Sequence, residues 1–273
     1  MAAGLSLVYG VLGVFNMALG QIALTGGYVT WWLVVHAFPL PIAMLGGLIA
    51  AALVTWFSFE ISVAPFYQRH RFLPLVTTIA LSMVLDGSIL MLFHEDPKSI
   101  IAGRGLLHFG STVIAVEQVI LIALTFLFLA VLTWALLGTP LGRRVRATVQ
   151  HPAAAQSLGI NAALLHRGIF ILSGVLAGCA GIFQVIDLNL TPVLGFSITI
   201  KAYAALIAGG KESLKGTIFC AYMIALLEQL AIGVPWFGGY ISAGYQATVA
   251  LLIIIVMLVC KPEGLFGSVT RRA

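Results

Sequence analysis

The sequence predicts an all-α fold, a polytopic transmembrane helical bundle that forms a single domain over residues 1–273. Hydrophobic residues make up 61% of the chain and charged residues 8%, and the mean hydropathy is +1.09. A soluble domain carries about 25% charged residues, so water is not the main solvent of this chain. Apolar windows of about 20 residues, the length with which a helix crosses the hydrocarbon core, cover most of the sequence. We therefore expect lipid to surround most of the helices.

Eight apolar windows are the predicted membrane spans, and the connections between them hold most of the charged residues. In chain order they lie at residues 17–36, 39–59, 73–93, 115–137, 165–186, 193–209, 215–233 and 243–260. Each is close to the roughly 20 residues that a span requires. An apolar stub, residues 1–15, precedes the first window and is too short to cross a bilayer comfortably. The expected architecture is thus about eight spans after a short N-terminal stub.

The distribution of Lys and Arg over the connections predicts the orientation, because positively charged loops are retained in the cytoplasm. The connections and adjoining span ends on the side of residues 138–164 hold eleven of them: Arg69, Arg71, Arg143, Arg144, Arg146, Arg167, Lys211, Lys215, Lys261, Arg271 and Arg272. The opposite side holds Lys98 and Arg104. We therefore expect residues 60–72, 138–164 and the C-terminus to lie in the cytoplasm and residues 94–114 outside.

Glycines inside the predicted spans favour close packing of helices. Gly174 and Gly178 form a GxxxG spacing, and Ala177 and Gly181 form an AxxxG spacing in the same window. Small residues at this spacing let two helix backbones approach closely. We expect Gly174, Gly178 and Gly181 to lie at helix contacts, and a flexible gate is the alternative interpretation.

Two acidic residues, Asp86 and Glu228, lie well inside predicted spans. An ionisable group at the bilayer centre costs about 2.5–3.5 kcal/mol even on a lenient scale, so each should face protein or water. Asp86 follows Ser82 by one turn, and this polar stripe is suited to a hydrogen bond with a neighbouring helix. Glu228 has two open interpretations: it lines a translocation pathway, or it makes a structural hydrogen bond between helices.

Common catalytic and cofactor-binding motifs are absent from the sequence. It has no GxxxxGK[ST] phosphate loop, no HExxH zinc helix and no GxSxG nucleophile elbow. Cys179, Cys220 and Cys260 lie inside apolar runs at spacings unlike those of metal sites or disulfide frameworks. The positive residues gather in short loops rather than on an aromatic-rich surface, which argues against nucleic acid as a partner. We expect no enzymatic activity, no cofactor and no metal, with an intramembrane hydrolase as a minor alternative.

The basic segment of residues 142–161 is the one sizeable polar stretch in the chain, and it predicts a short docking helix. Pro152 suits the first turn of a helix, and Gly159 suits the left-handed position that ends one. An Ala-rich helix of one or two turns, with Leu158 exposed, is expected between them. A helix this short is marginal alone in water, so contact with a partner protein would stabilise it. The alternative is a solvated basic loop that only fixes the topology.

Four motifs, taken in order, resemble those of the permease subunits of branched-chain amino-acid ABC importers. They are the N-x-A-x-G pattern that begins at Asn16, the coupling segment from Arg146 to Asn161, the L-A-G-x-A-G helix at residues 176–181 and the P-x-G-L-F-G ending at residues 262–267. The resemblance covers nearly the whole chain. Each motif alone is weak, but their combined order is specific.

This resemblance implies a subunit of a bacterial or archaeal inner membrane that forms half of a translocation pathway. The implied partners are a homologous permease, cytoplasmic ATP-binding subunits, an external solute-binding protein and membrane lipid. The residues implied to contact the ATPase are Ala153, Ala154, Ala155, Leu158, Gly159, Ile160 and Asn161. Asn16, Asp86 and Glu228 are the candidates for lining the pathway. A self-sufficient channel or secondary carrier for small polar solutes, and an ABC permease for urea or short amides, are the alternatives.

The chain departs from the family pattern at four places. The family usually has a complete hydrophobic helix before its first block, so with residues 1–15 alone we expect the chain to begin about one helix late. Leu19 stands where a histidine is common, and Ala153 stands where many importers have an acidic residue. The turn at residues 211–216 is more charged than that of the family. These departures leave the expected fold unchanged.

Overall fold

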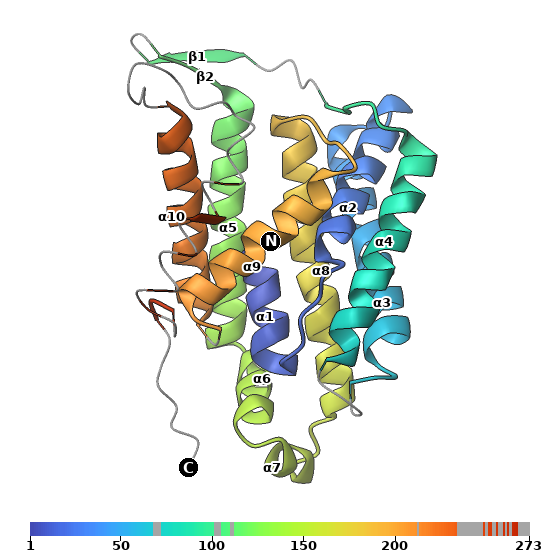
Figure 1. Ribbon diagram of the computed structural model, residues 1–273, viewed down its shortest axis with the longest axis vertical. Coiled ribbons are helices and arrows are strands. Elements are labelled where there is room, and N and C mark those ends of the chain that lie inside the picture. Colours follow the sequence, from blue (N-terminus) through green and yellow to red (C-terminus); the bar gives the residue numbers. More distant parts are fainter. Residues whose placement is uncertain are drawn as a thin grey trace.

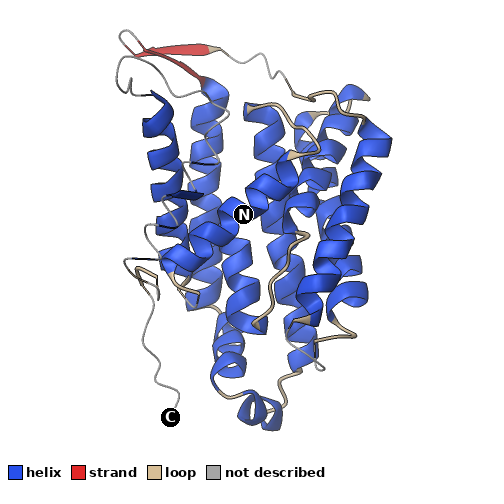
Figure 2. Ribbon diagram, viewed as in Figure 1, coloured by secondary structure: helices blue, strands red, loops and turns tan. Residues whose placement is uncertain are grey.

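The computed structural model describes residues 1–67, 72–100, 105–109, 112–211 and 213–233, together with 248, 251–252, 255, 259, 261 and 264–266. The described part is a bundle of helices with one small hairpin (Figures 1 and 2). The helices are α1 (Ala2–Leu12), α2 (Leu19–Val35), α3 (Leu40–Ser58), α4 (Leu73–Phe93), α5 (Val116–Gly138), α6 (Pro140–Gln150), α7 (Pro152–Ser157), α8 (Ala162–Asp187), α9 (Leu194–Gly209) and α10 (Leu214–Gly233). A π-helical turn (Phe59–Val63) continues α3, and the hairpin strands are β1 (Leu106–Phe109) and β2 (Thr112–Ala115).

The predicted fold class is confirmed. The first seven predicted windows each coincide with one helix, namely α2, α3, α4, α5, α8, α9 and α10 in that order. The eighth window, residues 243–260, lies outside the described residues apart from isolated positions. Among the described residues, five helices are long and apolar enough to cross a membrane: α3 with its π-helical turn, α4, α5, α8 and α10. Helices α1, α2 and α9 are apolar but shorter. The total number of spans stays a prediction.

The connection at residues 94–114, which the sequence predicts only as an external loop, contains the hairpin. Strands β1 and β2 pair antiparallel, with Leu106 opposite Ala115. Before the hairpin, Lys98 exchanges two backbone hydrogen bonds, of 2.9 and 2.7 Å, with Leu190, which precedes α9. The hairpin lies at one end of the bundle and α7 lies at the other (Figure 1). The two connections that the charge distribution assigns to opposite sides are therefore at opposite ends of the molecule.

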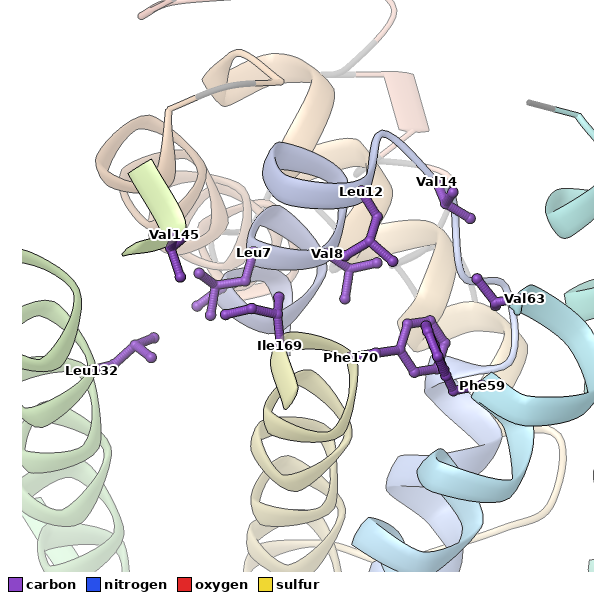
Figure 3. Packing of buried hydrophobic residues seen from close by; sticks show 11 residues of the cluster. Leu7, Val8, Leu12, Val14, Phe59, Val63, Leu132, Val145, Ile169 and Phe170 are labelled. Atoms are coloured by element: carbon purple, nitrogen blue, oxygen red, sulfur yellow. The ribbon is translucent and has the colours of Figure 1, made fainter. Parts of the chain in front are cut away.

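Helix α8 lies at the centre of the bundle and contacts α1, α2 and α3. Of its apolar window 61% is buried, against 6% for α5, so α8 is the central helix and α5 is peripheral. The ring of Phe170 in α8 lies 5.3 Å from that of Phe59 in the π-helical turn. Ile169 of α8 and Val8 of α1 belong to the same apolar cluster (Figure 3). The core is therefore built around α8.

Glycines on α8 allow it to pack closely against α2 and α3, because they have no side chain that would keep the helices apart. A Cβ at Gly178 would lie 2.6 Å from the Cβ of Ala51 in α3. A Cβ at Gly174 would overlap the side chain of Thr55, also in α3. A Cβ at Gly181 would overlap the carbonyl oxygen of Ala23 in α2. The helix backbones thus approach closely, and such van der Waals contact is what holds helices together in lipid. These contacts favour the packing interpretation of the three glycines.

The apolar N-terminal stub forms a buried helix, α1, which is followed by an extended segment. Leu5 and Val8 are buried because α8, α9 and α10 all contact α1. The helix ends at Gly13, whose φ of +66° is the left-handed conformation common at helix C-termini. Further on, the Met17 N–H donates to Thr78 Oγ1 of α4 at 3.3 Å. Non-helical backbone at membrane depth is tolerated when it is buried in protein, and Val14, Asn16 and Ala18 of this segment are buried.

Gly181→Ala should destabilise the bundle, because the added methyl group meets the backbone of Ala23 rather than a side chain that can move. We expect a loss of about 1–3 kcal/mol, the usual cost of overpacking, and a lower melting temperature of the purified protein in detergent. Gly168→Ala on the same helix is the matched control, since no atom lies within 4 Å of the Cβ that it adds. Equal melting temperatures for the two variants would contradict close packing at Gly181.

Candidate functional site

The predicted docking segment folds as two short helices, α6 and α7, at one end of the bundle (Figure 1). Helix α6 begins after Thr139, whose Oγ1 accepts a hydrogen bond from the Gly142 N–H at 3.4 Å. Val145 is buried on one face of α6, while Arg143 and Arg144 are exposed. The buried face packs α6 against α5 and α1, and the basic face is exposed on the surface of the protein.

Helix α7 has the boundaries that the sequence predicts. It begins at Pro152, and Gly159, with a φ of +80°, follows its last turn. The Gly159 N–H donates to the carbonyl oxygen of Gln156 at 2.9 Å, and the Ile160 N–H donates to that of Ala155 at 3.1 Å. A left-handed residue in this place closes a helix by satisfying its last carbonyl groups.

The seven residues predicted to contact an ATPase differ in exposure. Four of them are exposed: Ala154, Leu158, Gly159 and Asn161. Burial by a partner protein would stabilise Leu158 most, because 80% of this apolar residue is exposed. Ala155 is 2% exposed and anchors α7 to the protein instead, and Ile160 is half-buried. The side chain of Ala153 lies outside the described residues.

Asn161 joins α7 to the central helix α8. Its Oδ1 accepts a hydrogen bond from a backbone N–H in the first turn of α8 at 3.1 Å, which is the usual N-cap arrangement. One turn later Arg167 Nε lies 2.8 Å from Glu60 Oε1 in the π-helical turn after α3. The ring of His166 meets that of Tyr67 edge-on at 5.3 Å. The start of α8 is therefore tied both to α7 and to the end of α3.

Asn16 lies in the extended segment between α1 and α2 and is fully buried. Its Oδ1 accepts a hydrogen bond from the Ala18 N–H at 3.1 Å, while its Nδ2 has no partner among the described residues. The buried hydroxyl of Tyr203 in α9 lies beside the Asn16 backbone, with which it hydrogen-bonds. A buried polar atom without a partner costs about 1–3 kcal/mol, so we expect the Asn16 Nδ2 to meet water or a solute in the working protein.

Asp86 of α4 takes part in a hydrogen bond between two helices. Gln21 Nε2 of α2 donates to its Oδ1 at 3.2 Å. Gln21 is buried, and its own Oε1 has no partner within the described ranges. The bond is of the type predicted from the polar stripe on α4. Asn16 and Gln21 thus place unpaired polar atoms near the start of α2, which contacts both α4 and α9.

Glu228 of α10 forms an ion pair with Lys201 of α9. The Lys201 Nζ lies 3.0 Å from Oε1 and 3.1 Å from Oε2 of the carboxylate. The Glu228 side chain is 6% exposed and that of Lys201 is 31% exposed. A carboxylate is tolerated in such surroundings because a cation pairs with it. The geometry favours the structural interpretation of Glu228, a link between α9 and α10.

Lys201, Gln21 and Arg167 take part in these contacts but are not among the site residues predicted from the sequence. Lys201 is an isolated base in one predicted span, and Glu228 is an isolated acid in the next span along the chain. Because consecutive spans often neighbour each other, this pattern was a signal for a pair. Arg167 and Glu60 lie in or beside windows that are far apart in the chain, so they carried no such signal. Gln21 is uncharged and carried no comparable signal.

A family model described as branched-chain amino acid transport system / permease component matches residues 1–260 of the chain. Individual proteins are similar over nearly the whole chain as well. The chain is 27% identical to the high-affinity branched-chain amino acid transport system permease protein BraD of Pseudomonas aeruginosa, over 98% of this chain and 90% of that protein. It is 25% identical to the corresponding permease protein LivH of Escherichia coli K12, over the same shares. A probable LivH of Methanocaldococcus jannaschii is 27% identical over 98% of this chain and 87% of that protein.

Removing one member of the Lys201–Glu228 pair should destabilise the protein more than removing both. Lys201→Met leaves a buried carboxylate without its cation, which costs about 3 kcal/mol, the low end of the usual range because Lys201 is partly exposed. The double variant Lys201→Met/Glu228→Gln should recover most of the melting temperature and of the yield of folded protein. Effects of Lys201→Met and Glu228→Gln that simply add in the double variant would show that the two side chains are not coupled.

Proposed function

The chain belongs to the family of permease components of branched-chain amino acid transport systems, and on this premise we propose its mode of action. It is a multi-pass membrane permease, a transport protein and not an enzyme. We propose that it is one subunit of an ATP-driven importer in the cytoplasmic membrane of a bacterium or archaeon. A homologous permease completes the pathway, cytoplasmic ATP-binding subunits drive it, and an external solute-binding protein delivers the substrate.

Branched-chain amino acids are the proposed substrates. The observation that carries this proposal is the similarity, over 98% of the chain, to proteins named for the transport of these amino acids in two bacteria and an archaeon. Each aligned region also covers 87–90% of the relative, so the likeness extends beyond one shared motif. Because a separate binding protein delivers the solute, much of the discrimination between substrates rests with that partner.

Helix α7 is the proposed contact with the ATPase. Ala154 of α7 and Leu158, which follows the helix, are exposed, while Ala155 is buried and holds α7 against the protein. The exposed Leu158 side chain is therefore held in a fixed place. An exposed leucine beside a short helix gains about 1.5–3 kcal/mol when a partner buries it fully. The basic face of α6 adds positive charge beside this contact. Both helices lie at the end of the bundle opposite the hairpin (Figure 1).

Movement of α7 reaches the centre of the bundle through α8 in this proposal. Only four residues, 158–161, join α7 to α8, the last of them caps α8, and α8 is packed against α1, α2 and α3. Arg167 and Glu60 then pass the movement to the π-helical turn after α3. Turns of this kind occur often at functional sites in helices, where they interrupt the regular hydrogen-bond ladder.

The translocation pathway is proposed to pass the start of α2. The unpaired polar atoms of Asn16 and Gln21 lie in this region, and Asp86 adds a carboxylate. A zwitterionic solute needs such hydrogen-bonding groups when it leaves water. Glu228 is assigned instead to the structural link with Lys201.

The proposed importer should take up leucine, and isoleucine and valine should compete with it whereas urea should not. Gly159→Val should lower this uptake at least tenfold, because a β-branched residue at a φ of +80° costs roughly 1–3 kcal/mol of backbone strain and distorts the end of α7. The measurement is uptake and ATP hydrolysis by the complete importer in proteoliposomes. Gly168→Val, in open space on α8, is the control and should transport normally. Normal coupling in Gly159→Val at equal insertion would refute the docking role of α7.

The proposed orientation puts α6 and α7 in the cytoplasm and the connection of residues 94–114 outside, because of the Lys and Arg distribution. Single cysteines at Gln150 and Asp96, in a cysteine-free background, should differ in their labelling by an impermeant thiol reagent added to intact cells. Both positions are exposed, so accessibility within the fold does not limit either reaction. We expect Asp96→Cys to be labelled and Gln150→Cys to be labelled only after lysis. The reverse pattern would overturn the orientation.

A further inference from the structure

A cavity of 410 Å³ lies between α1, α5, α6 and α10 and is not used in the proposed transport mechanism. We call it the basic cavity, because Arg146 of α6 and Lys215 of α10 line it and no carboxylate stands among its described lining residues. The other walls are mainly apolar, with Leu7 of α1, Val145 of α6 and Ile218 of α10. Its volume falls within the range of about 300–1,000 Å³ that is typical of small-molecule sites.

Both cations of the basic cavity are exposed and are held at its edge. Arg146 Nη1 donates to the carbonyl oxygen of Leu136 in the last turn of α5, which fixes the guanidinium beside the cavity. A guanidinium has five N–H groups, so this bond leaves others for an anion. Lys215 lies in the first turn of α10, where the helix dipole adds positive potential. The basic cavity therefore combines an apolar interior with a positively charged edge.

A second hollow, of 780 Å³, adjoins the basic cavity and runs between α5 and α10. The two share the lining residues Thr133, Leu137 and Ile218. Most other residues along this α5–α10 groove are apolar, and the rings of Phe126 and Tyr222 stack there at 6.1 Å. Because α5 and α10 are both long enough and apolar enough to cross a membrane, the groove lies at the depth of lipid acyl chains.

We propose that the basic cavity and the α5–α10 groove together bind one anionic phospholipid. The phosphate lies between Arg146 and Lys215, and an acyl chain follows the groove. A neutral lipid would gain little from the two cations, and a soluble anion would leave the apolar groove, as the described residues form it, without an occupant. Basic pockets between membrane helices on the cytoplasmic side are suited to anionic headgroups, and this is the positive side of the chain. The inference does not depend on which solute is transported.

Lipid binding to the purified full-length chain in detergent tests the proposal. The probes are dioleoyl phosphatidylglycerol, which is anionic, and dioleoyl phosphatidylcholine, which is neutral; native mass spectrometry counts the bound molecules. Arg146→Gln/Lys215→Gln should weaken binding of the anionic lipid about 30-fold, since each cation near a headgroup contributes about five-fold. Arg144→Gln/Lys211→Gln is the matched control, because it removes one exposed cation from α6 and one from the α9–α10 connection outside the cavity. The control should bind as the wild type does.

Gly10→Phe tests the cavity itself while both cations remain. Gly10 lines the basic cavity, and a Cβ there meets no atom within 4 Å, so the ring should occupy the space intended for the lipid. We expect this variant to keep the wild-type melting temperature in phosphatidylcholine and to lose at least tenfold in affinity for phosphatidylglycerol. Glycerol phosphate, the soluble headgroup probe, should not displace the lipid at equal concentration.

Four results would each overturn the proposal. They are equal affinity of the wild type for the two lipids, equal weakening in the control variant, undiminished lipid binding by a folded Gly10→Phe, and displacement by glycerol phosphate at equal concentration. The last would mean that the cavity recognises a free phosphate group without any contribution from the groove.

Discussion

Lipid tails are as apolar as leucine side chains, so burial of apolar surface gives helices in a bilayer little reason to associate. In this protein the association depends on close backbone contact between α8 and its neighbours α2 and α3. Gly178 and Gly181 make that contact, since a side chain at either position would strike Ala51 or Ala23. Helix α1 packs on the same centre, and the extended segment that follows it buries Val14, Asn16 and Ala18 and donates a backbone N–H to Thr78.

The central helix α8 also connects the bundle to α7. Helix α8 is longer than the other helices of the described residues. Its first turn adjoins residues 158–161, the elbow between α7 and α8. A closely packed interior deforms little, so a displacement at the elbow is carried along α8 instead of being absorbed at its start. The pair Arg167–Glu60 gives that displacement a second route, to the end of α3. The contacts that stabilise the fold are in this way the contacts proposed to couple ATP hydrolysis to transport.

Local features of this fold could be predicted from the sequence, and features that depend on the assembled bundle could not. The apolar windows and the left-handed Gly159 follow from composition and backbone sterics over a few residues, and the structure has both. The burial of α1 could not be predicted, because it depends on three helices that come much later in the chain. The pairing of Glu228 with Lys201 had a signal, an isolated acid and an isolated base in consecutive spans, but the register of α9 against α10 that makes them face each other depends on the assembled bundle. The hairpin of β1 and β2 was missed because its strands are four residues long and give no strong pattern.

The central claim is that α7 and α8 move as one body when the ATPase acts. Spin labels at Gln156 and Ala163 report the α7–α8 elbow, and labels at Gln156 and Leu137 report the position of α7 relative to the peripheral helix α5; all three residues are exposed. Pulsed electron resonance on the complete importer, with and without bound nucleotide, measures both distances. The account predicts that the elbow distance stays constant while the distance to α5 changes. A change in the elbow distance when nucleotide binds would show that α7 moves relative to α8, and would contradict this coupling.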